Sequence, residues 1–398
     1  MKLNNNLVET QFENSFKLTK WALLLCGIKL SRKSLPIFLE FIINKLFFFN
    51  FFTLHSVVLS EIYGIIDGIQ TGKSLDELSF NVPCIAISIL STTKALFLYL
   101  NRDILKKMYH KLKEIHYVTH NTVVFPDDEH NMIKSSVSSN VLKIMIISFI
   151  SISSSTSITF TLFPLFFIAL KYIKTGELVI AYPFLVKYPL FDVMKTSWWP
   201  LLYFHHTLSA VSAVTTINIC GCDTMFFALC SYIGMNFRLL GFKFENSVTK
   251  SNEETKRNIK DNIRLHQELI GMVDQMEMIF SKSSLIQMVT ASLMICFTAF
   301  IFTIANELNV KFAFFTFLMT SLSQIAMICY FADLLTRSSA QIWESIYNCS
   351  WYEAENDVKK IILIIMIRSQ KACKLTAWKF GDLNLNAFSR VSDYFKPV

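Results

Sequence analysis

Two histidines and one aspartate are the residues within long apolar stretches that could carry out acid–base chemistry. Asp223 follows His206 by 17 residues, which is about 25 Å along a helix. An acid and a base must come within about 3 Å of the reacting atoms, so His205, His206 and Asp223 could not act together from one helix. The sequence also contains no zincin, nucleophile-elbow or P-loop string. We therefore predict that the protein is not an enzyme and has no catalytic residues.

The nine cysteines are the other residues that could do chemistry. They form no CxxC pair, and no His-rich spacing suited to zinc accompanies them. Cys220 and Cys222 are the one close pair, and we interpret them as small, polarizable residues on a buried helix rather than as a redox motif. We expect no metal site and no cofactor.

The composition indicates that these residues belong to a membrane protein. Hydrophobic residues make up 53% of the 398-residue chain, charged residues make up 17%, and the mean hydropathy is +0.42. The 37 phenylalanines and ten glycines favour helices packed against lipid over a β-rich fold with many tight turns. The net charge of +8 is dispersed among apolar runs, so we expect no nucleic-acid binding.

Long apolar runs predict the membrane spans, because a spanning helix needs about 20 mostly apolar residues. The candidate spans are residues 35–59, 78–100, 144–170, 196–237, 283–306 and 312–332. The fourth could hold two spans, but its available polar turn, residues 218–223, is thin for a loop, so we expect one long helix. Lys94 in the second span could extend its ammonium group to the membrane surface. Hydropathy alone does not identify a seventh span.

The distribution of basic residues predicts the orientation, because Lys and Arg accumulate in cytoplasmic loops. The N-terminal segment and residues 101–140 and 238–282 are rich in them, whereas residues 60–77 contain one. We therefore predict an all-α, polytopic seven-helix membrane protein with a cytoplasmic N-terminus, inverted relative to G-protein-coupled receptors. The glycosylation sequon at Asn348 would then face the cytoplasm, and we expect it to carry no glycan.

An ordered series of residues fills the C-terminal region. An acidic residue and a serine follow the sixth span, and after them come an aromatic pair, a basic-Ser-Gln block, a Leu-Thr-Ala string and an aromatic residue that opens the last helix. The residues at these positions are Asp333, Ser338 or Ser339, Tyr347, Trp351, Tyr352, Arg368-Ser369-Gln370, Leu375-Thr376-Ala377 and Phe388. This series resembles that of the insect odorant-receptor family. Weaker echoes in YPLFDVMKTSWWPLLYFHH and HQELIGMVDQMEMIFS extend the likeness upstream.

The resemblance implies a tuning subunit in the plasma membrane of sensory-neuron dendrites. Such a subunit binds a small volatile odorant and forms a hetero-tetramer with a co-receptor, in which the last helices line a cation pore. Residues 1–335 would then be the transmembrane ligand-binding bundle, 336–379 a cytoplasmic anchor segment and 380–398 a short pore-helix region. A gustatory-type receptor channel of the same superfamily and a membrane transporter remain alternatives. The Ser/Thr-rich residues 148–161 could line a transport path, although no internal repeat supports it.

Three groups of residues are the candidates for function. An apolar odorant needs a pocket lined by aromatic residues with one or two hydrogen-bonding groups, and the outer halves of the spans supply Thr159, Phe160, Phe163, Phe167, Tyr203, His206, Phe315 and Met319. Aromatic residues four apart share a helix face, so the expected subunit contacts include Trp343, Tyr347, Trp351 and the adjacent Tyr352. We also expect Arg368 and Gln370, from the basic-Ser-Gln block of the resemblance, to contact another subunit. The resemblance assigns the pore to Phe388, Tyr394, Phe395 and Val398.

The pore region departs from the family pattern. Tyr394-Phe395 follows Phe388-Ser389 after fewer residues than in the family. Lys396 and Pro397 stand where apolar residues are expected, and proline lacks the amide donor that a helix uses. Two explanations stay open, namely a truncated or divergent sequence, or a subunit that contributes poorly to a pore.

Overall fold

The described part of the chain is almost entirely helical. The computed structural model describes residues 10–31, 36–73, 78–79, 81–122, 139–176, 187, 198–205, 215–304 and 308–393. The helices are α2 (Lys17–Leu25), α3 (Ile37–Gln70), α5 (Asn81–Leu100), α6 (Arg102–Thr122), α8 (Ser139–Thr175), α9 (Trp199–Phe204), α10 (Thr215–Glu245), α11 (Asn252–Ile304), α12 (Leu308–Ala340), α13 (Ile342–Asn348), the 3-10 helix η2 (Trp351–Glu353), α14 (Asn356–Ser369) and α15 (Leu385–Asp393). Within these ranges one isolated bridge, Thr376 to Asp382, is the whole of the β-structure. The predicted all-α class is confirmed.

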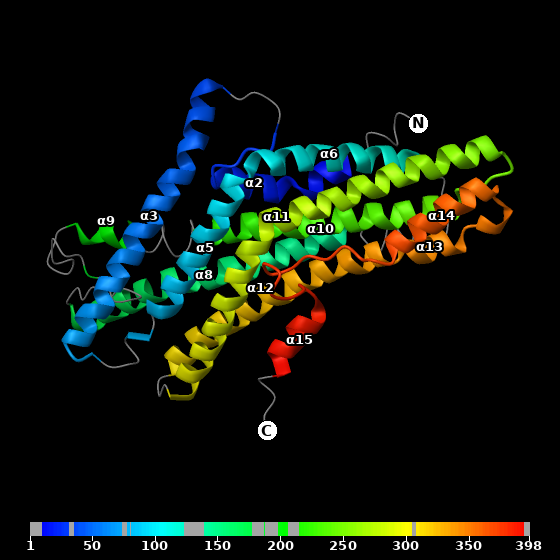
Figure 1. Cartoon of the computed structure of the whole chain (residues 1–398). Helices are drawn as coiled ribbons and strands as arrows, with labels where there is room; N and C mark the ends of the chain where they lie inside the picture. The colour runs from blue at the N-terminus through cyan, green and yellow to red at the C-terminus, as the bar shows by residue number, and fades with distance from the viewer. Residues whose placement is uncertain are drawn as a thin grey trace.

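Helix α10 is the central element of the bundle (Figure 1). It contacts α2, α5, α6, α8, α11, α12 and α13, and nearly all of its side chains are buried. A helix that is apolar on every side must be covered on every side, and α10 meets this condition with residues such as Phe227 and Leu229. Cys220 and Cys222 are 4% and 3% exposed on this helix, which agrees with our interpretation of them as buried helical residues.

The predicted spans fall on long helices. Five of the described helices, α3, α5, α10, α11 and α12, are long and apolar enough to cross a membrane. The predicted third span, residues 144–170, lies within α8. Of the predicted fourth span, the structure describes α9 and the part of α10 from Thr215 onward, and residues 206–214 lie outside the described residues. Residues 218–223 are helical and do not form a turn.

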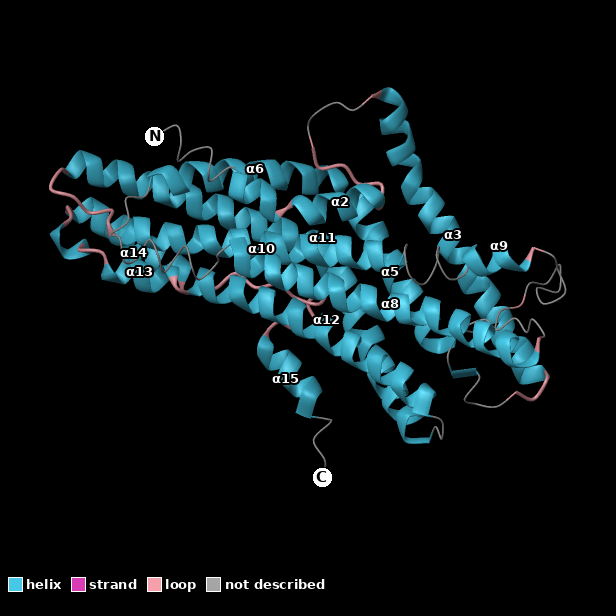
Figure 2. Ribbon diagram, turned by 180° about the vertical axis from the view of Figure 1, so that it is seen from behind, coloured by secondary structure: helices cyan, strands magenta, loops and turns pink. Residues whose placement is uncertain are grey.

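Several helices continue well beyond the apolar part of the bundle. Helix α11 has 53 residues, which is about 80 Å, and its N-terminal half carries most of its charged residues. Helix α11 contacts α6 and α14, while α10 contacts α6 and α13, and Lys111 of α6 pairs with Glu268 in the charged half of α11. Figure 2 shows α6, α10 and α11 side by side toward the end of the molecule that holds α13 and α14. The charged residues 241–245 and 252–282 are therefore helical, and residues 246–251 connect the two helices.

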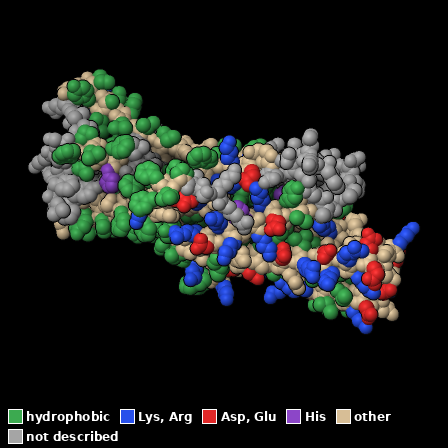
Figure 3. Space-filling model, turned by 90° about the horizontal axis from the view of Figure 1, so that it is seen from above, with side chains coloured by type: hydrophobic (Ala, Val, Ile, Leu, Met, Phe, Trp, Pro, Cys, Tyr) green, Lys and Arg blue, Asp and Glu red, His purple; other side chains and the backbone are tan. Residues whose placement is uncertain are grey.

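Charge divides the elongated molecule into two halves. In Figure 3, Lys, Arg, Asp and Glu side chains gather over one half, while hydrophobic side chains cover the described surface of the other. On α3, Ile37, Phe38 and Phe52 are 89%, 73% and 69% exposed. Large apolar side chains exposed in such numbers need lipid or a partner to cover them. The apolar half is therefore the membrane-embedded part of the protein.

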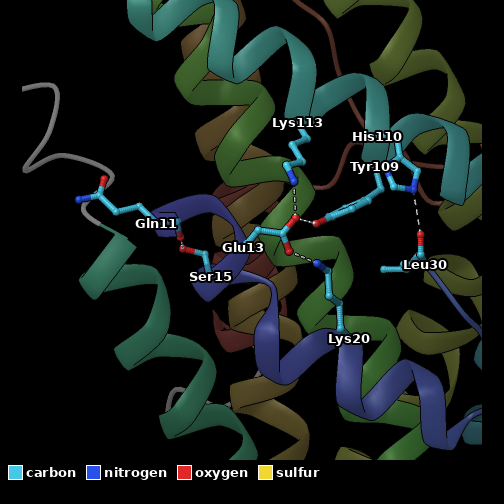
Figure 4. A network of polar contacts seen from close by, with 8 residues as sticks. All are labelled: Gln11, Glu13, Ser15, Lys20, Leu30, Tyr109, His110 and Lys113. Atoms are coloured by element: carbon cyan, nitrogen blue, oxygen red, sulfur yellow. Dashed lines mark hydrogen bonds and ion pairs between the residues drawn. The ribbon is translucent and has the colours of Figure 1, made fainter. Parts of the chain in front are cut away.

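The N-terminal segment is fastened to α6 by a carboxylate (Figure 4). Glu13 accepts hydrogen bonds from the Lys113 ammonium at 2.6 Å and the Tyr109 hydroxyl at 3.2 Å, and it also pairs with Lys20. Burial alone would raise the pKa of Glu13, but the hydrogen bonds from Lys113 and Lys20 outweigh burial and hold the pKa below 4.5. Phe12, which is 1% exposed, packs against Tyr109 beside this network. The N-terminal segment is thus part of the charged half.

Candidate ligand-binding site

A cavity lies between helices α5, α8, α10, α11 and α12. Its lining residues are Cys84, Ile87, Ser88, Leu90, Ser153, Ser157, Thr215, Thr216, Ile219, Thr290, Ala291, Met294, Phe317, Thr320, Ser321 and Gln324. Its volume is about 70 Å³, which is several times the roughly 10–15 Å³ that one water molecule needs. The cavity therefore has room for a small organic molecule.

Helical spacing brings these lining residues together. On α12 the lining residues are Phe317, Thr320, Ser321 and Gln324, which are three or four positions apart and therefore share one face. On α5 the lining residues Cys84, Ile87 and Ser88 follow the same spacing. Each helix thus contributes one stripe of side chains, and the stripes meet around the cavity.

The cavity is polar without being charged. Nine of the sixteen described lining residues carry a hydroxyl or an amide, and none of the sixteen is Asp, Glu, Lys, Arg or His. Two of these hydroxyls donate to carbonyls one turn earlier, Thr320 to the Thr316 oxygen at 2.8 Å and Ser157 to the Ser153 oxygen at 3.1 Å. The Ser157 and Thr216 hydroxyl oxygens lie 2.6 Å apart and join α8 to α10. Such a lining suits a small, mostly apolar ligand that carries one polar group.

A buried ion pair closes one side of the cavity. The Lys94 ammonium lies 2.5 Å from Asp223 Oδ1, and the Gln324 amide nitrogen donates to Asp223 Oδ2 at 3.0 Å. The Lys94 and Asp223 side chains are 3% and 5% exposed, so each charge depends on the other for its stabilisation. Lys94, Asp223 and Gln287 line a second cavity of about 10 Å³. The group of Lys94, Asp223 and Gln324, which we call the buried triad, therefore separates the two cavities.

Comparison with known proteins decides the family. Residues 74–393 match the family model described as 7tm Odorant receptor. The chain belongs to the odorant receptor family. Odorant receptor 92a of Drosophila melanogaster is 26% identical over 351 residues, which are 86% of this chain and 82% of that receptor. The odorant receptor coreceptor of Aedes aegypti is 26% identical over 148 residues, which are 37% of this chain and 31% of the coreceptor.

A solved odorant-receptor structure shares the fold. The insect olfactory receptor OR5 from Machilis hrabei matches 97% of this chain over 96% of its own length, with a TM-score of 0.81 and 15% identity. The same receptor in complex with eugenol matches with a TM-score of 0.80 and 14% identity, over 98% of this chain and 97% of that one. The predictions of an odorant receptor, of a polytopic helical membrane fold and of a protein that is not an enzyme are therefore confirmed.

The pocket residues predicted from the sequence do not coincide with the lining of the cavity where the structure describes them. Tyr203 is 5% exposed on α9, and Phe315 and Met319 are 47% and 49% exposed on α12. Because a helix turns about 100° per residue, both α12 residues lie far around the helix from Phe317. His206 lies outside the described residues, as do the side chains of Thr159, Phe160, Phe163 and Phe167. The ligand-binding role of these eight residues stays a prediction.

The buried triad is the part of this odorant receptor that sequence reasoning missed. We expected Lys94 to reach the membrane surface, and this was wrong because Lys94 is 4% exposed and pairs with Asp223. The sequence did contain a signal for this pairing, because Lys94 and Asp223 are each an isolated charge in an apolar segment and the two charges are opposite in sign. Ser153 and Ser157 of the cavity also belong to the Ser/Thr-rich run that we associated with a transporter.

The expected subunit contacts lie at the charged end and are exposed. The exposed fractions are 42% for Trp343, 58% for Tyr347, 38% for Trp351 and 63% for Tyr352. The prediction that Trp343, Tyr347 and Trp351 share one helix face is wrong, because α13 ends at Asn348 and Trp351 lies in η2. Arg368 and Gln370, at the end of α14, are also exposed. Their role in subunit contact stays a prediction.

Of the expected pore residues, the structure describes Phe388. It lies on α15 and packs against a cluster formed by Ala291 and Ile295 of α11 with Ile325 and Cys329 of α12. Tyr394, Phe395 and Val398 lie outside the described residues. The last helix of the described chain therefore rests against the two helices that also line the cavity.

Proposed function

We propose that this chain is an odorant receptor subunit that binds small volatile ligands in the cavity between α5, α8, α10, α11 and α12. On binding, it gates a non-selective cation channel in the plasma membrane together with a coreceptor. The observation that carries the proposal is the uncharged cavity of about 70 Å³ within the membrane-embedded half of an odorant-receptor fold. Its mixture of apolar residues and hydroxyls is the composition expected of a small-molecule site.

The relatives support both partners in this proposal. OR5 from Machilis hrabei, which shares the fold, has been solved in complex with eugenol, a small aromatic molecule. The chain is also similar to the odorant receptor coreceptors of Aedes aegypti and Aedes albopictus, which is in keeping with assembly of related subunits. A hetero-tetramer in which the exposed aromatic residues of α13 and η2 contact neighbouring subunits accounts for those side chains.

The orientation in this proposal places the charged half in the cytoplasm. Basic residues dominate the connectors on that side, and α6, α13 and α14 give it the character of a soluble helical bundle. An epitope fused to the N-terminus should therefore be stained by antibody after the cells are permeabilised and not before. Staining of intact cells would contradict this orientation.

Gating by so small a ligand limits the energy difference between the channel states. A ligand of about ten heavy atoms supplies at most about 10 kcal/mol of binding free energy. Only the part that differs between closed and open states drives opening. The closed and open states must therefore differ by only a few kcal/mol.

The proposed role of the cavity in ligand binding is tested by placing a larger side chain in it. The chain is expressed with and without a coreceptor, and the current evoked by a panel of odorants is recorded. Current is expected only with the coreceptor. In the Ala291→Phe variant, in which the new side chain replaces one that lines the cavity and is 4% exposed, the odorant concentration for half-maximal current should rise about a hundredfold or more, as an overpacked site requires.

Leu293→Phe is the matched control. Leu293 lies on the same helix and is 67% exposed, so the same bulk added there should leave the response unchanged. Surface expression is measured for both variants, and Met294→Ala, which enlarges the cavity, should shift the response toward larger odorants. Equal responses of the wild type and all three variants would place the ligand elsewhere, and a current that needs no coreceptor would contradict the proposed assembly.

A further inference from the structure

We propose that the cavity selects ligands that donate a hydrogen bond, such as small alcohols and phenols, and that the Gln324 side-chain oxygen accepts this bond. The inference rests on the proposed function and names the ligand class of the same cavity. Two observations carry it, namely the orientation of the Gln324 amide and the absence of a charged residue among the described lining residues.

The buried triad fixes the orientation of the Gln324 amide. Both oxygens of Asp223 are acceptors, since Oδ1 faces the Lys94 ammonium and Oδ2 faces Gln324 at 3.0 Å. The amide must therefore turn its nitrogen toward Asp223, because an amide oxygen there would face a carboxylate oxygen and be repelled. Gln324 is 9% exposed and lines the cavity. The atom that it can offer to a ligand away from Asp223 is its carbonyl oxygen, which is an acceptor.

Hydrogen bonds within the protein involve several of the lining hydroxyls. Ser157 donates to the Ser153 carbonyl at 3.1 Å, and Thr320 donates to the Thr316 carbonyl at 2.8 Å. In the 2.6 Å contact between the Ser157 and Thr216 hydroxyls either one can be the donor, and the hydrogen comes from Thr216 when Ser157 donates to Ser153, because a hydroxyl has a single hydrogen. A ligand that brings a donor can therefore satisfy the Gln324 oxygen, whereas one that brings only acceptors leaves that oxygen without a hydrogen bond.

The donor should be neutral. The sixteen described lining residues contain no ionisable carboxylate, ammonium or imidazole, and the nearby charge of Asp223 is already paired with Lys94. A cationic amine would lose its hydration in the cavity without gaining an opposite charge. A hydroxyl on an apolar body meets both requirements.

The test compares ligands that differ in one hydrogen-bond donor. The chain with its coreceptor is exposed to straight-chain primary alcohols and to the isomeric methyl alkyl ethers, which have the same number of heavy atoms. Eugenol and its methyl ether form a second pair. We expect the ether to require a concentration at least about tenfold higher than the alcohol for half-maximal current, which is the effect of one unmade hydrogen bond.

Three variants assign the preference to Gln324. Gln324→Met keeps the length of the side chain and removes the acceptor, so the alcohol-to-ether ratio should fall to near one. In the double variant Lys94→Met with Asp223→Asn, the introduced amide is neutral and can donate as well as accept, so the Gln324 amide is no longer held and the ratio should shrink. Ser323→Ala, one position from Gln324 and absent from the described cavity lining, should retain the full ratio.

The outcomes separate this inference from the proposed function. Ethers that act as well as their alcohols, or an unchanged ratio in a surface-expressed Gln324→Met variant, would overturn the ligand class while the odorant-gated channel stands. A chain that reaches the cell surface with its coreceptor and gives no current with any odorant would overturn the proposed function itself.

Discussion

At the scale of single residues, the buried triad is the most consequential feature of the apolar half. An unpaired charge buried in apolar surroundings destabilises the fold by more than an intact buried ion pair stabilises it. The Asp223→Ala change removes the partner of Lys94, which is 4% exposed, and we expect it to lower the free energy of unfolding by about 3–5 kcal/mol. Thermal unfolding of the purified protein and its amount at the cell surface measure the effect.

The double variant Lys94→Met with Asp223→Leu is the control for the ion pair. It removes both charges at once, so it should recover most of the stability that Asp223→Ala loses. If the double variant were as unstable as the single one, the pairing of the two charges would not be the cause.

Glu13 gives a prediction about pH at the same scale. Its pKa lies below the ordinary value of 4.5 in the folded protein, so the ionised carboxylate stabilises the fold above that pH, and the stabilisation is lost as the pH falls through the folded pKa. At neutral pH, Glu13→Gln should lower the free energy of unfolding by about 1 kcal/mol. The difference in melting temperature from the wild type should shrink as the pH falls below 4.5. A difference that grew in acid would contradict this role.

At the scale of elements, the close approach of α10 to its neighbours depends on glycine. A Cβ at Gly241 would lie 2.8 Å from Ser345 Oγ and 3.4 Å from Ser345 Cβ. We expect Gly241→Leu to push α10 and α13 apart and to lower the free energy of unfolding by about 1–3 kcal/mol. Gly271→Ala on α11 is the matched control, since no atom lies within 4 Å of the added Cβ. It should raise the stability by about 0.5–1 kcal/mol, and thermal unfolding distinguishes the two signs.

The positions of the long helices could be predicted from the sequence, but the faces that they turn to the cavity and some of their ends could not. Apolar runs located the long helices, because length and hydropathy are properties of one segment. The face that a helix turns to the cavity depends on its neighbours, so we chose Phe315 and Met319, whereas Phe317 and Gln324 line the cavity. The end of α13 at Asn348 was missed for a related reason, since the extended backbone of Cys349 has no strong signal in the residues around it.

At the scale of the whole molecule, the charged half is the place where assembly can be tested. Trp343 and Tyr347 on α13 are 42% and 58% exposed. If they contact another subunit, replacing both with Ser should weaken co-purification with the coreceptor about thirtyfold or more, as the loss of a central aromatic contact does. Tyr172→Ser is the control, because Tyr172 is 54% exposed on α8 in the apolar half. Equal co-purification of all variants would place the interface elsewhere.

The continuity of α11 has a mechanical consequence. Ala291 borders the cavity, and Asn252, at the other end of the same unbroken helix, donates to Glu355 at 2.6 Å directly before α14. The two positions are about 58 Å apart along the axis, so a tilt of about 2° at the cavity would displace the far end by about 2 Å. A small tilt of α11 at the cavity is thus amplified into a larger displacement at its N-terminal end. If the proposed ligand tilts α11 at the cavity, the far end of the helix should move by a distance comparable to the length of the hydrogen bond between Asn252 and Glu355.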